Sequence, residues 1–365
     1  MAPRIAIAHD WLVSYAGSER CVEEMLHLYP DAPLLTTLVD RSAMPGPLAR
    51  AQPSFLQSVP GALAHHEWLV PLMPLAWRSR RAITDADVVI SSSHACAKAV
   101  RVGAGVQHLC YCHTPMRYAW DFEAERSRFP RAIRPVARAG MAWFRQWDRR
   151  TSDGVTQFVA NSSAVARRIH DAYGRSATVI HPPVKTDYFT PDGTRSDHFL
   201  YVGRLVGYKQ PELAVAIFAG LPHRLVVVGD GAARAALEAQ ATPNVEFVGS
   251  VDDETLRGLY RSARALINPG EEDFGIAMAE AQACGTPVIA LDAGGAVDIV
   301  EDERTGWLVG NRGVEAWRAA VRRAAADELD AREIAAAAQR FSAPRFRAEI
   351  AAAVEALAAG GAGAA

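Results

Sequence analysis

The chain has 365 residues, and because a domain usually holds about 100–200 residues, this length predicts two domains. The formal net charge is −2, half of the residues are hydrophobic and 22% are charged. This composition excludes collagenous, coiled-coil and wholly disordered proteins, and its overall charge does not predict nucleic-acid binding. Any anionic partner would have to be bound by local clusters of positive charge.

Neither a membrane span nor a secretion signal is expected. No uninterrupted apolar run reaches the roughly 18–20 residues that cross a bilayer, and the longest candidate, 68–77, contains two prolines. The N-terminus lacks a basic and then apolar signal segment. Five cysteines in mostly apolar contexts suit reduced thiols. We therefore expect a cytoplasmic protein, with the inner face of the plasma membrane as its place of peripheral contact.

Short β-branched apolar runs alternate with helical patterns along the chain, which is typical of a doubly wound α/β fold. One helix is expected to begin at Ser18, a candidate N-cap, because apolar residues follow it at helical spacing. The proline-rich stretch 182–198 is expected to be a linker. The expected strands are 5–9, 34–39, 88–91, 107–112 and 157–160 before this stretch, and 199–202, 225–228, 245–248, 265–267 and 288–291 after it. Further helices are expected at 212–218, 232–240, 254–262 and 275–284.

These elements predict two Rossmann-like domains that face each other across a cleft, where ligands bind beyond the carboxyl ends of the strands. The N-terminal domain would span 1–181 and the C-terminal domain 199–340. The remaining segment, 341–365, would form a helix that packs back on the N-terminal domain and frays at its end.

The segment 268–280, NPGEEDFGIAMAE, follows an expected strand and passes through a glycine turn into a helix. The amides of the first helical turn would bind an anion. Glu272 precedes the helix and Glu280 lies two turns inside it, so about 12 Å would separate them at ~1.5 Å per residue. The pair could hold the two ends of a ligand with a central diphosphate, as in a nucleotide sugar; the alternative is two solvated glutamates. The expected donor-binding residues here are Glu272, Asp273, Phe274, Gly275, Ile276 and Glu280.

Two basic residues follow the expected strand 199–202. Arg204 and Lys209 could both project into the cleft, where a planar guanidinium and a mobile ammonium would bind adjacent phosphates. Basic residues that follow a strand are commonly only solvated. The prediction that Arg204 and Lys209 bind phosphates therefore depends on the presence of segment 268–280.

These segments resemble the donor-binding half of the retaining glycosyltransferases of family four, which have the GT-B fold and a Glu-x7-Glu motif matched by Glu272 and Glu280. Segment 9–20 resembles the family's first strand and glycine loop, and HTPMRYAWD at 113–121 resembles a signature of its bacterial polysaccharide mannosyltransferases. Segments 161–169 and 181–184 also fit, so the resemblance covers about residues 4–310.

The resemblance implies roles for single residues. Glu272 would hold hydroxyls of the donor sugar, Glu280 the ribose, and Arg204 and Lys209 the diphosphate. Gly17 would approach the diphosphate from the other domain, and the preceding Ala16, where relatives often carry glycine, would be strained at positive φ. The implied catalytic residues are His113, which would lie over the sugar, with Glu272, Arg204 and Lys209. The nucleobase is expected near Val248, Gly249 and Val251, none of which selects guanine over uracil.

No metal or other cofactor is expected. The one Asp-x-Asp triplet that bears on this question, 85–87, precedes a strand instead of following one. Cys110, Cys112 and His113 could suggest a metal site, but strand alternation places the thiols on one face and His113 on the other. The charge of the leaving diphosphate would be offset by the basic residues and the helix dipole. The resemblance implies that the acceptor hydroxyl attacks the face from which the diphosphate leaves.

Segment 124–150 contains eight arginines and two acidic residues, a local balance of +6, interleaved with aromatic residues. Basic residues beside exposed aromatics suit an anionic membrane, where a polyprenyl-diphosphate-linked acceptor would lie; a solvated arginine face over a buried core is the equal alternative. RNA is disfavoured, because no known RNA-binding module is present.

Segment 229–234 begins like a dinucleotide fingerprint but has Arg234 in place of its third glycine.

The sequence thus predicts a retaining hexosyltransferase that moves mannose from GDP-mannose to a saccharide or lipid-linked saccharide during synthesis of a surface polysaccharide or glycolipid. The alternatives are a UDP-sugar donor and a noncatalytic protein that binds a nucleotide sugar or a glycan.

Overall fold

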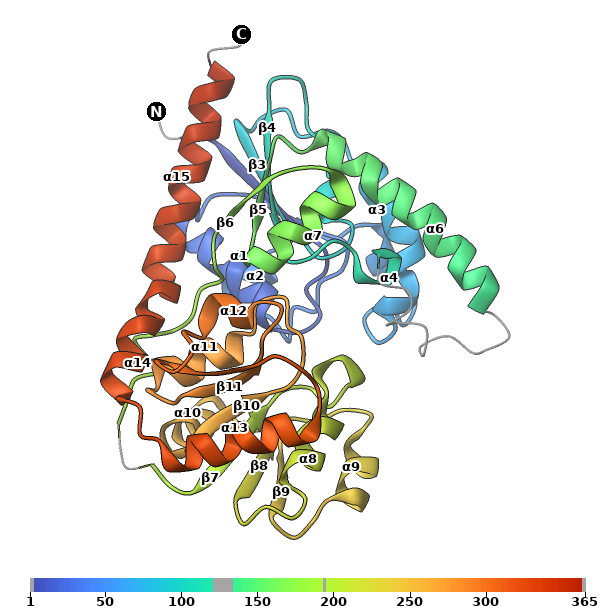
Figure 1. Ribbon diagram of the computed structural model, residues 1–365. Helices are drawn as coiled ribbons and strands as arrows, with labels where there is room; N and C mark the ends of the chain where they lie inside the picture. The colour runs from blue at the N-terminus through green and yellow to red at the C-terminus, as the bar shows by residue number, and fades with distance from the viewer. Residues whose placement is uncertain (1–2, 121–133, 193–194, 363–365) are drawn as a thin grey trace. The chain divides into compact units, whose positions relative to one another are not determined.

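The computed structural model describes residues 3–120, 134–192 and 195–362. The chain divides into two compact units, Met1–Pro183 with Pro344–Ala365 (unit 1) and Val184–Ala343 (unit 2). Each unit is built on its own parallel sheet (Figure 1). The last residues of the expected frayed end, 363–365, and residues 121–133, which include 124–133 of the arginine-rich segment, lie outside the described residues.

Unit 1 contains six parallel strands in the order β2-β1-β3-β4-β5-β6. All residues of β1 and β3 are buried, which is typical of parallel strands covered on both faces. The register pairs His9 with Ser92, and Ser93 with Cys112, so that the carboxyl ends of β1, β3 and β4 lie at one edge. The strands are β1 (Ile5–His9), β2 (Leu34–Thr36), β3 (Val88–Ser93), β4 (Gln107–Cys112), β5 (Gln157–Ala160) and β6 (Ala177–Val179).

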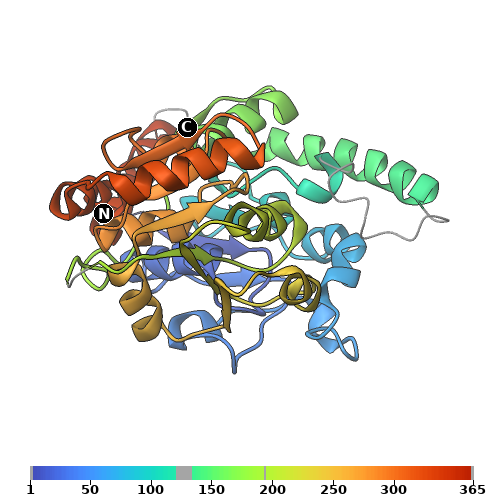
Figure 2. The same cartoon turned by 60° about the horizontal axis from the view of Figure 1, so that its bottom comes forward.

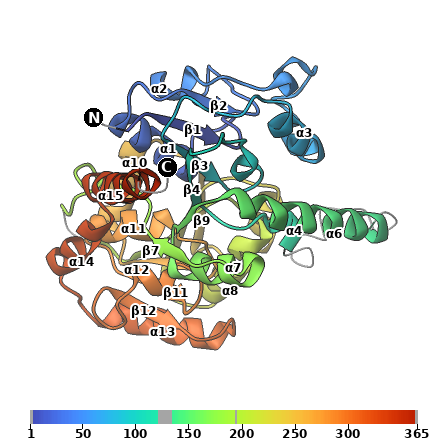
Figure 3. The ribbon, with the colours of Figure 1, turned by 90° about the horizontal axis from the view of Figure 1, so that it is seen from above.

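Helices cover the sheet of unit 1, and the last helix of the chain is among them. Phe346, Ile350 and Val354 of α15 are buried in one core with Val22 and Met25 of α1. Figure 3 shows α15 end-on beside α1, and Figure 2 shows the N-terminal end of α6 projecting beyond the other helices of its unit. The α-helices are α1 (Gly17–Leu28), α2 (Gly46–Ala49), α3 (Met73–Arg78), α4 (Arg117–Trp120), α6 (Arg134–Thr151), α7 (Ser163–Tyr173) and α15 (Ala343–Ala362). Short 3-10 helices are η1 (Phe55–Ser58), η2 (His66–Leu72), η3 (Ala97–Ala99) and η6 (Ser152–Gly154).

Unit 2 contains a second sheet of six parallel strands, in the order β12-β11-β10-β7-β8-β9. Alternate residues face opposite layers: Phe199 and Tyr201 pack in the core that contains Trp317 of α13, and Leu200 packs in the core that contains Tyr260 of α10. The strands are β7 (His198–Val202), β8 (Arg224–Val228), β9 (Val245–Gly249), β10 (Ala265–Asn268), β11 (Val288–Leu291) and β12 (Gly306–Val309). The helices are η7 (Gly207–Lys209), α8 (Pro211–Phe218), α9 (Arg234–Gln240), α10 (Asp253–Ser262), α11 (Ile276–Ala283), α12 (Ala296–Ile299), α13 (Val314–Ala326), α14 (Ala331–Ala338) and η8 (Gln339–Phe341).

The predicted α/β class with two Rossmann-like domains is confirmed by these sheets. Four expected strands, those at β1, β4, β5 and β11, match residue for residue. β6 and β12 are not among the expected strands; both are short edge strands. The division falls between Pro183 and Val184, and the residues that follow it pack within unit 2, where Val184 N–H donates to the carbonyl of Phe341 at 2.8 Å and Phe189 is buried.

Candidate functional site

Lys209 and Glu272 form an ion pair in unit 2, with 2.7 Å between Nζ and Oε1. Lys209 ends η7, and Glu272 lies in the loop between β10 and α11. Their side chains are 18% and 15% exposed, so the pair is partly covered and accessible to a ligand. The hydroxyl of Tyr201 donates to the carbonyl of Lys209 at 3.3 Å. Burial raises the pKa of Tyr201, as do Glu272 and other nearby acidic residues, which keeps the phenol protonated as a donor.

Glycines bring the backbone around Lys209 into close contact. A Cβ at Gly270 would lie 2.8 Å from Cα of Lys209, and a Cβ at Gly203 would lie 3.1 Å from its Cδ. Gly229 adopts φ +122, and a Cβ there would lie 2.1 Å from the carbonyl oxygen of Gly203. The glycines of segment 229–231, which resemble a dinucleotide fingerprint, therefore pack against the Lys209 loop.

The helix that follows Glu272 begins at a glycine in the left-handed region. Gly275, at φ +100, is the N-cap of α11, and Phe274 before it is buried. Met278 N–H donates to the carbonyl of Gly275 at 2.9 Å, whereas the amides of Ile276 and Ala277 have no acceptor within the helix. Binding of an anion by these two amides stays a prediction. The Gly294-Gly295 pair, which is not among the predicted site residues, supports this loop: Gly295 N–H donates to the Glu272 carbonyl at 2.9 Å. A Gly-Gly pair three residues after a buried strand is the sequence signal for it.

The two glutamates of the Glu-x7-Glu pattern have different surroundings. Glu280 is only 4% exposed, and its Oε2 accepts a hydrogen bond from the hydroxyl of Tyr260 at 3.1 Å. Glu272 pairs instead with Lys209. The structure therefore brings Lys209 and Glu272 together, and it holds Glu280 one and a half turns into α11 beside α10.

The other predicted residues of unit 2 lie near the ends of β7 and β9 and at the start of α11. Arg204 is exposed, and its Nη2 donates to the hydroxyl of Tyr208 at 2.9 Å. Val248 is 37% exposed at the end of β9, and Gly249 follows it at φ +76. A Cβ at Gly249 would lie 3.0 Å from Nη1 of Arg234. Ile276 and Val251 pack at the edge of the unit 2 core, and Asp273 is partly buried.

In unit 1, the Gly17 loop begins α1 without strain. The predicted N-cap Ser18 is wrong: Ala16 is the N-cap, at φ −139, so it does not adopt the positive φ that would have been costly. Its N–H donates to Oε2 of Glu19 at 3.0 Å, and the hydroxyl of Ser18 donates to the same oxygen at 3.0 Å. The carboxylate of Glu19, at the third helical position, therefore accepts the N–H of the N-cap residue, which is one of the two bonds of a capping box.

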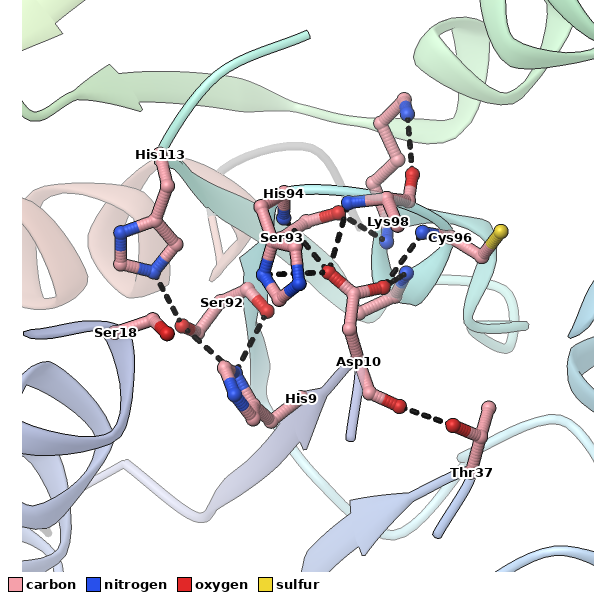
Figure 4. Close-up of polar contacts among 12 residues, drawn as sticks. His9, Asp10, Ser18, Thr37, Ser92, Ser93, His94, Cys96, Lys98 and His113 are labelled. Atoms are coloured by element: carbon pink, nitrogen blue, oxygen red, sulfur yellow. Dashed lines mark hydrogen bonds and ion pairs between the residues drawn. The ribbon is translucent and has the colours of Figure 1, made fainter. Parts of the chain in front are cut away.

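Asp10, directly after β1, binds the loop that follows β3. Its carboxylate accepts four backbone N–H bonds, from His94 and Ala95 on Oδ2 at 2.7 and 2.8 Å and from Cys96 and Ala97 on Oδ1 at 2.5 and 2.6 Å. Burial alone would raise the pKa of Asp10, but His94, His9 and these N–H groups lower it overall. Asp10 is thus a buried anion that fixes the loop beside His113 (Figure 4).

His113 follows β4 and is 9% exposed. Its Nε2 lies 2.8 Å from Oγ of Ser92, which lies 3.1 Å from Nδ1 of His9; Nε2 of His9 lies 3.4 Å from Oε1 of Glu19. Figure 4 shows His9, Ser92 and His113 in this line. Burial, together with His94 and His9, holds the pKa of His113 well below its ordinary value. Cys110 and Cys112 pack instead in a core with Val165 and Ile169 of α7, so they are separated from His113 as the strand alternation predicts.

Three segments that resemble the family, 113–121, 161–169 and 181–184, are linked by hydrogen bonds near His113. Nδ2 of Asn161 donates to the carbonyl of His113 at 3.0 Å, and Nδ1 of His181 donates to the carbonyl of Asn161 at 3.1 Å. Segment 161–169 therefore holds the backbone of segment 113–121, and segment 181–184 holds the backbone of segment 161–169.

The described part of the arginine-rich segment, 134–150, lies in α6. Asp148, counted in its charge balance, is buried and forms an ion pair with Lys98, so it does not offset the arginines at the surface. Trp120 Nε1 and the hydroxyl of Tyr173 each donate to Oδ2 of Asp148 at 2.7 Å. Trp143 is 61% exposed, whereas Phe144 is buried.

Around α6, the basic surface is formed by the exposed residues Arg138, Trp143, Arg149 and Arg150, hereafter the α6 surface. Arg145 lies instead with its guanidinium 6.0 Å from the ring centroid of Trp120. Among the described residues, no helix is long and apolar enough to cross a membrane, and no cluster of three potential metal-ligating side chains occurs.

Comparison with known proteins agrees with this organisation. Residues 15–188 match the model of Glycosyltransferase Family 4, and residues 191–341 match that of Glycosyl transferases group 1. Over 191 residues, the chain is 33% identical to a D-inositol 3-phosphate glycosyltransferase of Mycolicibacterium paratuberculosis, which covers 45% of this chain and 43% of the relative. A protein of the same name from Mycobacteroides abscessus is 34% identical over 176 residues, which is 42% of this chain and 40% of the relative. The chain thus spans less than half the length of these curated relatives.

Solved structures share the fold over nearly the whole chain. HepE of Anabaena, in complex with UDP-glucose, superposes with a TM-score of 0.69 at 17% identity, covering 97% of this chain and 100% of HepE. Sucrose-phosphate synthase of Thermosynechococcus elongatus gives a TM-score of 0.69 at 20% identity, covering 97% and 96%. At these identities the likeness establishes the GT-B fold alone.

Proposed function

We propose that this chain, which joins a glycosyltransferase family 4 domain to a glycosyl transferases group 1 domain, is an enzyme that transfers a hexose from a nucleoside diphosphate sugar to a saccharide acceptor. The observation that carries this proposal is the Lys209–Glu272 pair, 2.7 Å apart, directly before the N-terminus of α11. An ammonium group and free helix amides suit a diphosphate, and a neighbouring carboxylate suits sugar hydroxyls.

The proposal assigns the donor to unit 2. Lys209, Arg204 and the first turn of α11 bind the diphosphate, and Glu272 binds hydroxyls of the hexose. Glu280, oriented by Tyr260, binds the ribose. The end of β9, at Val248, Gly249 and Val251, lies beside the base. Arg234 close to Gly249 adds a donor group to this region.

The reaction we propose is a transfer with retention of configuration. The bond between the anomeric carbon and the phosphate oxygen breaks, and Lys209 with the α11 terminus stabilises the negative charge on the departing diphosphate. The acceptor hydroxyl attacks the same face of the sugar, and its proton passes to the departing phosphate oxygen. Because these groups supply the positive charge, activity is expected to persist after dialysis against EDTA.

For the donor, we propose GDP-mannose, supported by the resemblance of HTPMRYAWD at 113–121 to bacterial mannosyltransferases. A UDP-hexose is the second candidate, favoured by the fold neighbour HepE, whose structure contains UDP-glucose. For the acceptor, we propose a saccharide, carried on a polyprenyl diphosphate at the inner face of the plasma membrane. The exposed Trp143 and the arginines of the α6 surface support that location.

Thermal-shift measurements with a panel of nucleotide sugars test the donor assignment. A ligand that binds the folded state stabilises it by mass action, by about 2.7 kcal/mol at 100 times Kd. We expect GDP-mannose to raise the Tm of the wild type and to leave that of Lys209→Ala unchanged. A Tm shift with UDP-glucose alone would identify UDP-glucose, and not GDP-mannose, as the donor. Binding of nucleotide sugars without any turnover would indicate the noncatalytic alternative.

A further inference from the structure

We infer that Glu19, His9 and Ser92 form a hydrogen-bonded relay that fixes the tautomer of His113, so that His113 presents an Nδ1–H donor to the substrate. The inference deepens the proposed function, because it rests on His113 contacting the sugar nucleotide or the acceptor. The four residues come from β1, α1, β3 and the end of β4, all within unit 1.

The donors and acceptors of the relay can be assigned starting from His9. Its Nδ1 lies 3.1 Å from the carbonyl oxygen of Ser92, which can only accept a hydrogen bond, so Nδ1 must carry a proton. Its Nε2 faces Oε1 of Glu19 at 3.4 Å. Burial alone would raise the pKa of Glu19, but the hydrogen bond and charge of His9 lower it, which keeps the carboxylate ionised. Both ring nitrogens of His9 therefore face acceptors, the Ser92 carbonyl on one side and the Glu19 carboxylate on the other.

The hydroxyl of Ser92 accepts a hydrogen bond on one side and donates one on the other. The single Nδ1–H of His9 is shared between two acceptors of Ser92, the carbonyl oxygen and Oγ, each 3.1 Å away, so Oγ accepts on that side. Its own hydrogen is then directed to Nε2 of His113, 2.8 Å away. Because Nε2 of His113 accepts, the proton of the neutral ring resides on Nδ1. Among the described residues, no hydrogen bond to Nδ1 of His113 is found, and Figure 4 shows this nitrogen on the side of the ring away from Ser92.

The other face of the same sheet contains a natural comparison. Oγ of Ser91 lies 2.8 Å from Nε2 of His108. Nδ1 of His108 lies 3.2 Å from the carbonyl oxygen of Gly154, which accepts a hydrogen bond from the Nδ1–H group. The two serine–histidine pairs thus have the same tautomer, but in His108 both nitrogens bond within the protein. In His113 one donor remains for a ligand.

This assignment limits the chemistry of His113. With Nε2 bonded to Ser92 and a proton on Nδ1, the ring is a neutral hydrogen-bond donor and not a general base. It would bind an oxygen atom, either a sugar hydroxyl or a phosphate oxygen. Glu19, His9 and Ser92 are positioning residues, since they act through His113.

Long-range ¹H–¹⁵N correlation spectra of the imidazole rings test the relay without requiring activity. The chain has 11 histidines, and the His113 signals are assigned by their loss in His113→Gln. In the wild type we expect the pattern of a neutral ring protonated at Nδ1. In Ser92→Ala the pattern should move toward a mixture of both tautomers, whereas Ser91→Ala, the matched control, should leave His113 unchanged. An Nε2–H pattern in the wild type, or no change in Ser92→Ala, would overturn the inference.

Kinetics supply a second readout. Loss of one ordering hydrogen bond, about 1 kcal/mol, should reduce kcat/KM roughly 5- to 10-fold in Ser92→Ala and less than about 2-fold in Ser91→Ala. An asparagine amide can reproduce the Nδ1 donor and a glutamine amide the position of Nε2, so His113→Asn should retain more activity than His113→Gln. The reverse order would contradict an Nδ1–H donor. If no nucleotide sugar is turned over, the proposed function fails, while the spectra still decide the tautomer.

Discussion

Lys209 and Glu272 lie 63 positions apart in the sequence, yet Nζ of the lysine is 2.7 Å from Oε1 of the glutamate. The contact is possible because Gly270 lets the backbone before Glu272 approach Cα of Lys209, where a Cβ would lie 2.8 Å away. The donor-binding chemistry proposed for unit 2 depends on this pair.

Removal of either partner should abolish most of the transfer activity. In Lys209→Ala the diphosphate loses its ammonium, and in Glu272→Ala the donor sugar loses a carboxylate, so we expect roughly a 100-fold fall in kcat/KM for each. The matched control is the ion pair of Arg224 with Glu246, 2.8 Å apart and more than half exposed, whose alanine variants should remain active. Wild-type turnover in Lys209→Ala or Glu272→Ala would remove that residue from the mechanism.

The glycine that supports Glu272 should tolerate no side chain. Gly294 adopts φ +64, and a Cβ there would lie 2.3 Å from the carbonyl oxygen of Glu272. We expect Gly294→Ala to lower the free energy of unfolding by about 1–3 kcal/mol and to weaken donor binding. Chemical denaturation and ligand titration measure the two effects. Gly310→Ala, which would meet nothing within 4 Å, is the control, and equal behaviour of the two variants would contradict the role of Gly294.

Asp148 should be essential for the stability of unit 1. Its carboxylate pairs with Lys98 and accepts bonds from Trp120 and Tyr173; Asp148, Lys98 and Tyr173 are buried, and Trp120 is partly buried. Asp148→Asn leaves the lysine charge buried without its counter-ion, so the free energy of unfolding should fall by about 3–5 kcal/mol. Asp153→Asn, at an exposed aspartate nearby, should change it by less than about 0.5 kcal/mol. A loss below about 1 kcal/mol in Asp148→Asn would show that the pair contributes little.

Acid should destabilise unit 1 through His108. Burial lowers the pKa of His108 to about 4 from an ordinary 6.5, so between these pH values the unfolded chain binds more protons than the folded one. The contribution of neutral His108 to the free energy of unfolding is fully present above pH 6.5. It falls as the pH is lowered, by about 3 kcal/mol at pH 4. Denaturant unfolding of the wild type and of His108→Gln, followed by tryptophan fluorescence across this range, should show a shallower pH dependence in the variant. Identical slopes would contradict the assignment.

The α6 surface should bind anionic membranes. Each arginine near such a surface contributes about 1 kcal/mol, so charge reversal at Arg138, Arg149 and Arg150 should weaken partitioning onto anionic liposomes by roughly 100-fold or more. Arg145 is left in place because it packs on Trp120. A triple variant of the exposed Arg41, Arg322 and Arg332 to glutamate is the control for net charge. Equal sedimentation of wild type and α6 variant would refute membrane binding by this surface.

The regular part of the fold could be predicted because buried parallel strands are continuous apolar runs. The strand β11 is an example, because its four residues, VIAL, are all apolar and buried and its expected bounds equal the observed ones. β6 could not be predicted in this way, since its three residues are partly or fully exposed and it is held by pairing with β5.

The site was predictable only where a residue type carries the chemistry. The pattern of Glu272 and Glu280 is visible in the sequence, but the bond that ties Lys209 to Glu272 is not. Asp10 is bound by backbone amides more than 80 positions away, and amides leave no signal in a sequence. Ser18 was mistaken for the N-cap because serine is a common N-cap residue, whereas here Glu19 caps the helix with its own carboxylate.

The most direct test of the central claim is a transfer assay with GDP-mannose, UDP-glucose and other nucleotide sugars, offered with a polyprenyl-diphosphate-linked saccharide. NMR would be used to determine the anomeric configuration of the product. We predict nucleoside diphosphate release coupled to a glycoside of retained configuration, with GDP-mannose as the best donor and with no turnover above about 1% in Lys209→Ala. An inverted product would contradict the proposed route, and the absence of transfer from every donor would contradict the assignment as a glycosyltransferase.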